Sequence, residues 1–187
     1  MREATAGLMT VEQYCELPEP GSFYYELHHG KLVRMSWPNF GDIVVRSRLW
    51  KQLDPALDGH GIVMTRLPFR ALPEYDLRVA DVGYLTRERW KQINDEDYFL
   101  GAPDLIVEVL SQSTTPIEVS EKIGLCLENG CREVWVVDRC LRQISVSTPD
   151  ALTRTYRSGD SIPLAFAENQ ALKVDSVFMD KARDGIV

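Results

Sequence analysis

Residues 104–110 read DLIVEVL, and residues 134–137 read VWVV. Each is an almost unbroken apolar run, which is typical of a strand covered on both faces of a sheet. The segment between them, PIEVSEKIGLCLE at 116–128, has apolar residues at helical spacing and ends before Gly130, a common helix stop. A strand, a helix and a second strand therefore form the centre of the predicted fold.

The segments before this centre predict further parts of the same core. Asp42 can cap a helix that runs to about Leu57, followed by strands over 62–71 and 77–85 and a short surface helix over 87–93. The order helix, strand, strand, strand, helix, strand indicates an α/β (α+β) fold with a mixed sheet and a helix on each face. The helix is expected to bury Ile43, Val44, Leu49, Leu53 and Leu57, and the second strand to place Leu77, Val79, Asp81, Gly83 and Leu85 on one side.

The two ends of the chain add smaller elements. Thr10 and Gln13 have capping-box spacing, which predicts a helix from Thr10 to about Leu17. Two β-hairpins are expected, an N-terminal one over 23–27 and 31–35 and a second over 142–147 and 152–156, with a weaker strand or helix in the tail to Val187. We expect one domain over 1–187, with its core at about 41–138, the N-terminal helix and hairpin at 10–36 and C-terminal strands at 142–187.

The 187 residues include 21 Lys and Arg against 28 Asp and Glu, for a formal net charge of −7. With 44% hydrophobic and 26% charged residues the composition is that of a globular protein, which excludes a disordered or collagen-like chain. No apolar run approaches the ~20 residues of a membrane span, and Met1–Thr10 lack the apolar region of a secretory signal. A cytoplasmic protein with no membrane partner is expected.

The acidic balance disfavours a protein that coats nucleic acid through bulk charge, but an enzyme can still bind nucleic acid through a local basic face. Arg46, Arg48 and Lys51 cluster on one segment, and Arg66 and Arg70 share one face of another. Such clusters are equally consistent with ordinary solvated surface, so both interpretations stay open.

Two acidic residues stand out because they interrupt apolar strands. Glu108 lies inside residues 105–110, and Asp81 lies inside residues 79–82. Adjacent strands lie about 4.8 Å apart, so the two carboxylates can converge, and at ~4 Å they would repel by about 4 kcal/mol at an effective dielectric of about 20. A divalent cation bound between the two carboxylates would replace this repulsion with attraction. Oxygen-only ligation by Asp, Glu and a main-chain carbonyl predicts Mg²⁺ or Mn²⁺ rather than zinc.

Lys122 falls among the residues expected on the inner face of the helix over 116–128, which are Ile117, Val119, Ile123, Cys126 and Leu127. A lysine there can extend outward to solvent or reach the end of the strand that carries Glu108. Alone, Lys122 favours the first interpretation, but Asp81 and Glu108 favour the second. Two carboxylates, a metal and a lysine are the groups that phosphodiester hydrolysis requires.

Other polar residues near the strands have structural interpretations. Asp104 and Glu108 are four residues apart on one strand, about 13 Å between their backbones, so they cannot chelate one ion. Asp104 and Asp138 are expected to bind turn amides. His28 and His29 would point to opposite faces of a strand, so we interpret them as part of a surface turn before Gly30 rather than as metal ligands.

The chain resembles the Uma-type restriction endonuclease family, a bacterial branch of the PD-(D/E)XK nuclease superfamily, from about Met9 to Met179. The matching stretches are MTVEQY at 9–14, YELHHGKLV at 25–33, ADV at 80–82, GAPDLIVEVLS at 101–111, Lys122, and EVWVVD at 133–138. The resemblance implies a restriction-endonuclease-like fold and bacterial origin. Ala80 in place of the motif proline, and the lack of the family's histidine near Gly41, are departures, and the second would weaken substrate contacts.

The resemblance also implies roles for individual residues. The metal carboxylates map to Asp81 and Glu108, and the motif lysine, usually two residues after the glutamate, moves onto the following helix as Lys122. Leu110 occupies the position where that lysine ordinarily stands. Glu26 matches a glutamate that recurs in the N-terminal hairpin of the family and is an accessory candidate.

The resulting hypothesis is a Mg²⁺-dependent or Mn²⁺-dependent endonuclease that hydrolyses nucleic acid, with DNA the expected substrate. Asp81, Glu108 and the Val109 carbonyl would hold the metal, Lys122 would support the nucleophile or the developing charge, and Glu26 would assist. A homodimer is one option for an enzyme that cuts both strands. The alternative is a catalytically inactive nuclease-fold module that binds nucleic acid or protein. A phosphohydrolase of small nucleotides is disfavoured, because no GxxxxGK[ST] phosphate loop is present.

Overall fold

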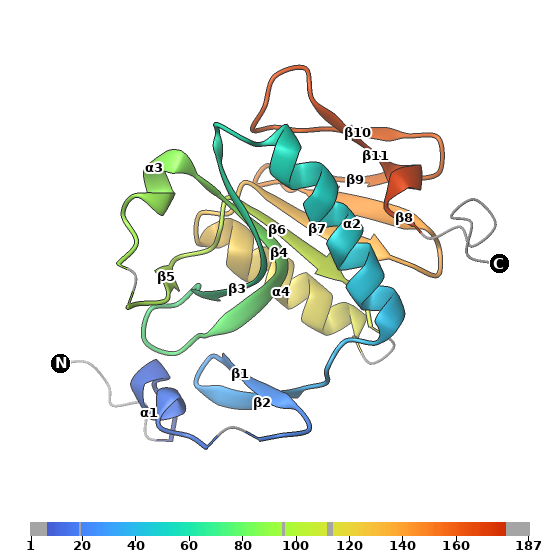
Figure 1. Ribbon diagram of the computed structural model, residues 1–187. Coiled ribbons are helices and arrows are strands. Elements are labelled where there is room, and N and C mark those ends of the chain that lie inside the picture. The colour runs from blue at the N-terminus through green and yellow to red at the C-terminus, as the bar shows by residue number, and fades with distance from the viewer. Residues whose placement is uncertain (1–6, 19, 95, 112–113, 179–187) are drawn as a thin grey trace.

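The computed structural model describes residues 7–18, 20–94, 96–111 and 114–178. Within these residues a seven-stranded sheet has the strand order β5-β3-β4-β6-β7-β8-β9 (Figure 1). Its strands are β3 (Gly61–Arg70), β4 (Arg78–Thr86), β5 (Phe99–Leu100), β6 (Leu105–Val109), β7 (Glu133–Asp138), β8 (Gln143–Ser147) and β9 (Thr153–Tyr156). The predicted mixed sheet is confirmed, because β6–β7 and β3–β5 are parallel and the other pairs are antiparallel.

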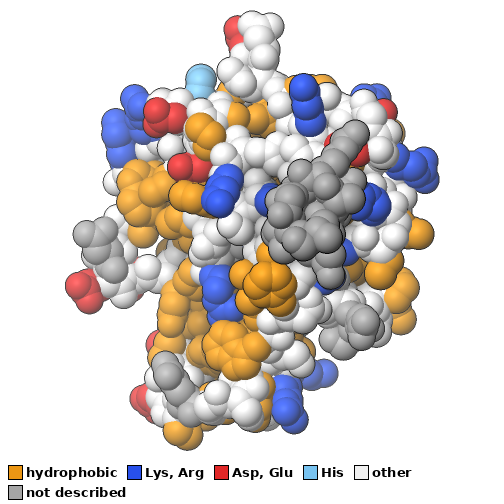
Figure 2. Space-filling model, turned by 45° about the vertical axis from the view of Figure 1, so that its right-hand side comes forward, with side chains coloured by type: hydrophobic (Ala, Val, Ile, Leu, Met, Phe, Trp, Pro, Cys, Tyr) orange, Lys and Arg blue, Asp and Glu red, His pale blue; other side chains and the backbone are white. Residues whose placement is uncertain are grey.

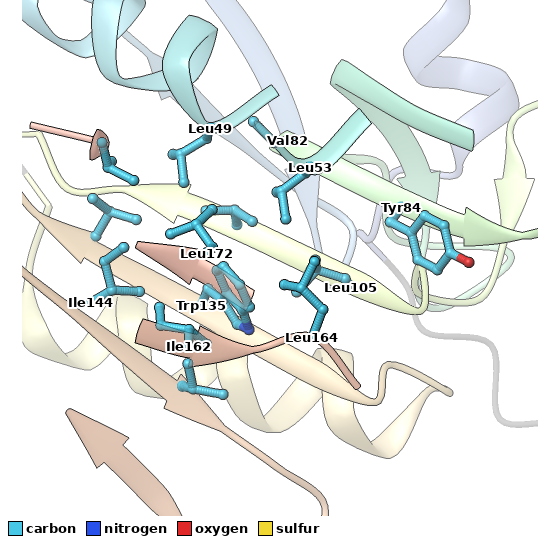
Figure 3. Packing of buried hydrophobic residues seen from close by; sticks show 14 of the residues in the cluster. Leu49, Leu53, Val82, Tyr84, Leu105, Trp135, Ile144, Ile162, Leu164 and Leu172 are labelled. Carbon is cyan, nitrogen blue, oxygen red and sulfur yellow. The ribbon is translucent and has the colours of Figure 1, made fainter. Parts of the chain in front are cut away.

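Two helices cover opposite faces of the sheet, as predicted. The long helix α2 (Phe40–Ala56) lies over one face and α4 (Pro116–Glu128) over the other (Figure 1). Leu49 and Leu53 of α2 pack with the sheet residues Leu105 and Trp135 (Figure 3). The larger core lies on the α2 face, where it also includes Ile162, Leu164 and Leu172 from the C-terminal segment.

The helix α4 has the predicted bounds because its end signals are local in sequence. Thr115 caps it by accepting the Glu118 amide, the Glu118 side chain accepts the Thr115 amide, and Pro116 occupies the first turn. Gly130 follows with φ +101°, a conformation that a side chain disfavours. This helix connects the parallel strands β6 and β7. Their carboxyl ends lie side by side, with Val109 opposite Val137.

The helix α2 differs from the prediction in its start and in its buried face. Asn39, not Asp42, is the N-cap, and Asp42 is the third helical residue, whose side chain accepts the Asn39 amide. The helix therefore begins earlier, and its buried apolar residues are Val45, Leu49 and Leu53, followed by Leu57 at the end. Ile43 is exposed, because a residue two positions before Val45 points away from the core.

In β3 and β4 the side chains that face α2 in one half of the strand give way, at the same alternate positions, to side chains that face α4 in the other half. Val63 and Val82 belong to the core under α2, whereas Leu67 and Ala80 belong to the core under α4. The switch occurs where the ladder skips one position, between the pairs Thr65–Val82 and Leu67–Ala80. At that position Arg66 has φ +55°, and a left-handed residue redirects the side chains that follow it. The prediction that β4 keeps one side from Leu77 to Leu85 was therefore wrong.

The remaining elements surround this sheet. The predicted N-terminal helix is present as α1 (Val11–Cys15), and the predicted hairpins are β1–β2 (Tyr24–His28 and Lys31–Met35) and β8–β9. The hairpin β1–β2 joins the core through the Leu27–Leu77 bridge. Short elements complete the described chain: α3 (Arg87–Trp90), the antiparallel pair β10 (Ser161–Pro163) and β11 (Ala171–Lys173), and the 3₁₀ helix η1 (Val174–Ser176). No helix in the described ranges is long and apolar enough to cross a membrane.

Two glycines give stability predictions of opposite sign. A Cβ on Gly61 would overlap the Leu85 carbonyl oxygen and the Tyr84 ring, whereas a Cβ on Gly124, inside α4, meets nothing within 4 Å. We expect Gly61→Ala to lower the free energy of unfolding by about 1–3 kcal/mol and Gly124→Ala to raise it by about 0.5–1 kcal/mol. Urea unfolding of both variants measures the two changes, and an unaltered Gly61→Ala protein would contradict the close β3–β4 packing.

Candidate active site

A cavity of about 560 Å³ opens beside the carboxyl end of β6, between the hairpin β1–β2, α2, β4 and α4. Every residue proposed from the sequence as catalytic or metal-binding lines it: Glu26, Asp81, Glu108, Val109 and Lys122. They come from β1, β4, β6 and α4, so the fold alone brings them together. Leu110, two residues after Glu108, also lines the cavity.

Asp81 is buried and both of its carboxylate oxygens have partners. Arg46 of α2 lies 2.7 Å from Oδ1, and the amide of Val109 donates to Oδ2 at 2.8 Å. Burial raises the pKa of Asp81, and the Arg46 charge and the Val109 hydrogen bond oppose that rise. The carboxylate therefore bridges α2 and the end of β6 while facing the cavity.

Glu108 and Lys122 form an ion pair across the same cavity. Lys122 Nζ lies 2.8 Å from Glu108 Oε1 and donates to the Val79 carbonyl at 3.1 Å. Burial, with Asp81 nearby, raises the pKa of Glu108 to about 7, while Lys122 acts in the opposite direction. Burial alone would lower the pKa of Lys122, but Glu108 and Glu26 raise it above its ordinary value. Lys122 is therefore a fixed cation and not a proton acceptor.

Glu26 reaches the cavity from the hairpin. Its Oε1 accepts the Val79 amide at 3.3 Å, and its Oε2 lies 2.8 Å from His28 Nε2. Burial acts to raise the pKa of Glu26, but Lys122 and His28 lower it overall. The interpretation of His28 as surface turn was wrong, because this imidazole lines the cavity. Both Glu26 oxygens are engaged, and Glu26 supports β4 at Val79, whose carbonyl accepts from Lys122.

Arg46 is a residue of this site that the sequence did not assign. It was visible only as one member of a basic cluster, and the structure separates that cluster. Arg46 enters the cavity, Arg48 donates to the Phe178 carbonyl at 2.8 Å, and Lys51 is exposed. The second basic pair is also divided, since Arg70 lies 3.0 Å from Glu12 whereas Arg66 lies over two aromatic rings.

A second charged network fixes the hairpin to α4 behind Lys122. The fully buried Arg78 donates from Nε to Asp76 at 2.6 Å and from both terminal nitrogens to Glu121 at 2.8 Å. His29 closes the network from the hairpin turn, through its amide to Asp76 and its ring to Glu121. Because Glu121 and Lys122 are neighbours on α4, this network holds the helix turn that carries the lysine.

Asp138 binds turn amides as predicted, whereas Asp104 binds the end of β4 instead and lies 3.3 Å from Arg89. Asp104 accepts the Thr86 amide at 2.9 Å, and Asp138 accepts the amides of Cys140 and Leu141. Neither lines the cavity. Among the described residues, no three His, Cys, Asp or Glu side chains form a preassembled metal cluster.

Comparisons with known proteins identify a family and a similar fold. The profile of the Uma2 family, described as "Putative restriction endonuclease", matches residues 11–175. The chain belongs to the Uma2 family. A similar solved structure is a protein from Anabaena variabilis titled a putative nuclease belonging to DUF820, with a TM-score of 0.78 and 19% identity over 91% of this chain and 97% of that one.

At 19% identity this similarity bears on the fold alone. It confirms the fold class that was predicted for this chain. A comparison with curated proteins gave no significant match. Membership of the Uma2 family supports a nuclease, which is the coarse form of the hypothesis drawn from the sequence.

The network behind Lys122 gives a pH prediction. Hydrogen bonds from Arg78 lower the pKa of Glu121 to about 2. A carboxyl whose folded pKa is lowered stabilises the fold above its unfolded pKa, here about 4.5, and loses that contribution as the pH falls through the folded value. We expect Glu121→Gln to cost about 1 kcal/mol at neutral pH, a modest value because the carboxylate is partly exposed.

The difference between wild type and Glu121→Gln should shrink as the pH falls from about 4.5 toward about 2. Urea unfolding across this range measures it, and exposed Glu128→Gln on the same helix is the matched control. A pH-independent difference would contradict the charge pairing.

Proposed function

We propose that this Uma2 protein is a divalent-metal-dependent endonuclease that hydrolyses phosphodiester bonds of nucleic acid, with DNA as its substrate. The observation that carries the proposal is the meeting of Asp81, Glu108 and Lys122, from three separate elements, in one cavity. Family membership supports the nuclease class, and the metal, the substrate and the residue roles are our inference.

The donor atoms at the end of β6 fit a hard cation. Asp81 and Glu108 offer carboxylate oxygens and Val109 offers a main-chain carbonyl, the ligand type that Mg²⁺ and Mn²⁺ prefer. Asp81 Oδ1 already neutralises one cation, the Arg46 guanidinium. When bound there, Mg²⁺ or Mn²⁺ would supply a water of lowered pKa and a Lewis acid for the scissile phosphate.

The remaining roles belong to charged side chains of this chain. Lys122, held by Glu108 and the Val79 carbonyl, is a permanent cation that can stabilise the charge developing on the phosphate. Arg46 can exchange its Asp81 contact for a phosphate oxygen, because a guanidinium binds carboxylate and phosphate with the same fork of donors. Glu26 orients Lys122 and β4 through the Val79 amide.

One observation favours the alternative, a catalytically inactive nuclease-fold module. Arg46 pairs with Asp81 and Lys122 pairs with Glu108, so the two carboxylates are neutralised without any metal. A protein that had lost its chemistry could keep these pairs for stability alone. The two interpretations differ in what a divalent cation does to the protein and in whether Lys122 is needed for cleavage.

The first prediction of the proposal concerns cleavage. Purified protein with Mg²⁺ or Mn²⁺ should cut nucleic acid, and Lys122→Ala should lower the rate by about 10²–10³-fold, because it removes a charge that stabilises the transition state. A gel assay with single- and double-stranded DNA and RNA measures this. Exposed Lys91→Ala should be near neutral. Equal cleavage by Lys122→Ala and wild type would remove Lys122 from the mechanism.

The second prediction concerns metal binding. Mn²⁺ at a hundredfold excess over its Kd should stabilise the protein by about 2.7 kcal/mol. Glu108→Gln should lose most of this gain, because it removes a ligand charge while keeping the shape. Glu133→Gln is the control, since Glu133 is another buried strand carboxylate that lies outside the cavity and accepts from Trp135. Equal melting shifts in wild type and Glu108→Gln would place the ion elsewhere.

A further inference from the structure

Two aromatic side chains line the cavity and a third, exposed one follows three residues later in the sequence; we call Tyr24, Trp37 and Phe40 the aromatic rim. Tyr24 of β1 and Trp37 line the cavity, with ring centroids 5.2 Å apart and planes tilted by 45°. Phe40 is the first residue of α2 and follows Pro38 and Asn39, which line the cavity as well. Trp37 is 51% exposed and Phe40 74% exposed, so both rings offer free apolar surface.

Arginines accompany these rings. The Arg66 guanidinium lies 5.0 Å from the ring centroids of both Tyr24 and Trp37. Arg34, which lines the cavity, lies 4.2 Å over the neighbouring ring of Phe23. The face in Figure 2 has hydrophobic side chains directly beside Lys and Arg side chains in its lower half. The cavity mouth therefore combines flat apolar surface with positive charge, whereas the carboxylates lie deeper.

The backbone at Arg66, which places the guanidinium beside these rings, is left-handed. Arg66 has φ +55°, a left-handed conformation that is unfavourable for a residue with a side chain. It lies opposite Asp81, at the one position that the β3–β4 ladder skips. Strain of this kind is found where function requires a particular side-chain direction, and here it turns the guanidinium toward the aromatic rim.

We propose that the aromatic rim binds unpaired bases, so that the substrate of the cavity is a single-stranded segment of nucleic acid. Exposed rings beside arginines stack on base faces and contact phosphates, which is how proteins hold single strands. Base faces inside a duplex are covered by their neighbours and cannot reach Trp37 or Phe40. A base stacked on the rim would leave its phosphate at the cavity that holds Asp81 and Lys122. The inference rests on the proposed nuclease function.

Oligonucleotide binding measured without divalent cations, so that no cleavage occurs, tests the aromatic rim separately from the nuclease activity. In EDTA, fluorescence anisotropy is measured with labelled oligothymidylate, labelled oligouridylate and a blunt DNA duplex of the same length. Both single strands should bind at least about tenfold more tightly than the duplex, and the Trp37→Ala/Phe40→Ala double variant should bind them about 10–100-fold more weakly, the effect of losing one or two stacked bases. Duplex binding should not change.

Trp90→Ala is the matched control, because Trp90 is an exposed tryptophan on α3 that does not line the cavity. It should bind single strands as wild type does. Equal affinity for duplex and single strands, or an unchanged affinity in the double variant with its fold intact by circular dichroism, would overturn the proposal.

Arg66 supplies a test that separates binding from folding. Arg66→Gly removes the backbone strain as well as the cation, so its melting temperature should equal or exceed that of wild type while affinity for single strands falls about five- to tenfold. Arg142→Gly is matched to it, since Arg142 has φ +50°, lies over the Phe178 ring and does not line the cavity. Arg142→Gly should keep full affinity, and a full-affinity Arg66→Gly would contradict a contribution of Arg66 to single-strand binding.

The outcomes distinguish this inference from the proposed nuclease function. A protein that cuts no nucleic acid but binds single strands through Trp37 and Phe40 contradicts the nuclease and supports the rim. A protein that cuts duplex and single strands at equal rates, with no effect of the double variant, supports the nuclease and overturns the rim. Comparing oligothymidylate with oligouridylate decides whether DNA or RNA supplies the bases.

Discussion

Two carboxylates within buried strands, Asp81 of β4 and Glu108 of β6, are the constraint around which this protein is organised. An ionised group in such a place needs a partner, and each carboxylate has a cation from a different helix: Arg46 of α2 for Asp81 and Lys122 of α4 for Glu108. The two helices that cover opposite faces of the sheet thus each place a cation beside the neighbouring strands β4 and β6. Glu26 extends the same arrangement to the hairpin through the Val79 amide.

The core and most elements could be predicted because their signals are local. The α4 bounds follow from Thr115, Pro116 and Gly130, and the apolar run of β6 identifies a strand covered on both faces. The two acidic interruptions of apolar strands were sufficient to indicate Asp81 and Glu108, and the resemblance added Glu26. All three line the same cavity.

The remaining features depend on tertiary contacts or on unusual backbone. Nothing near Arg46 distinguishes an arginine that enters a cavity from one in solvent, so its pairing with Asp81 was not predictable. The change of faces in β3 and β4 depends on a left-handed Arg66, where neither glycine nor asparagine signals that conformation. At the start of α2, Asn39 and Asp42 both suit an N-cap, and their reciprocal hydrogen bonds place the cap at Asn39.

The central claim is that Asp81 and Glu108 share a divalent cation. The most direct measurement is a crystal structure of the protein soaked in Mn²⁺, with an anomalous difference map. The account predicts one strong peak between the two carboxylates, about 2.1–2.2 Å from an oxygen of each, with the Arg46 guanidinium moved away from Asp81. An intact Arg46–Asp81 pair with no manganese between the carboxylates, at a concentration that fills other sites, would contradict it.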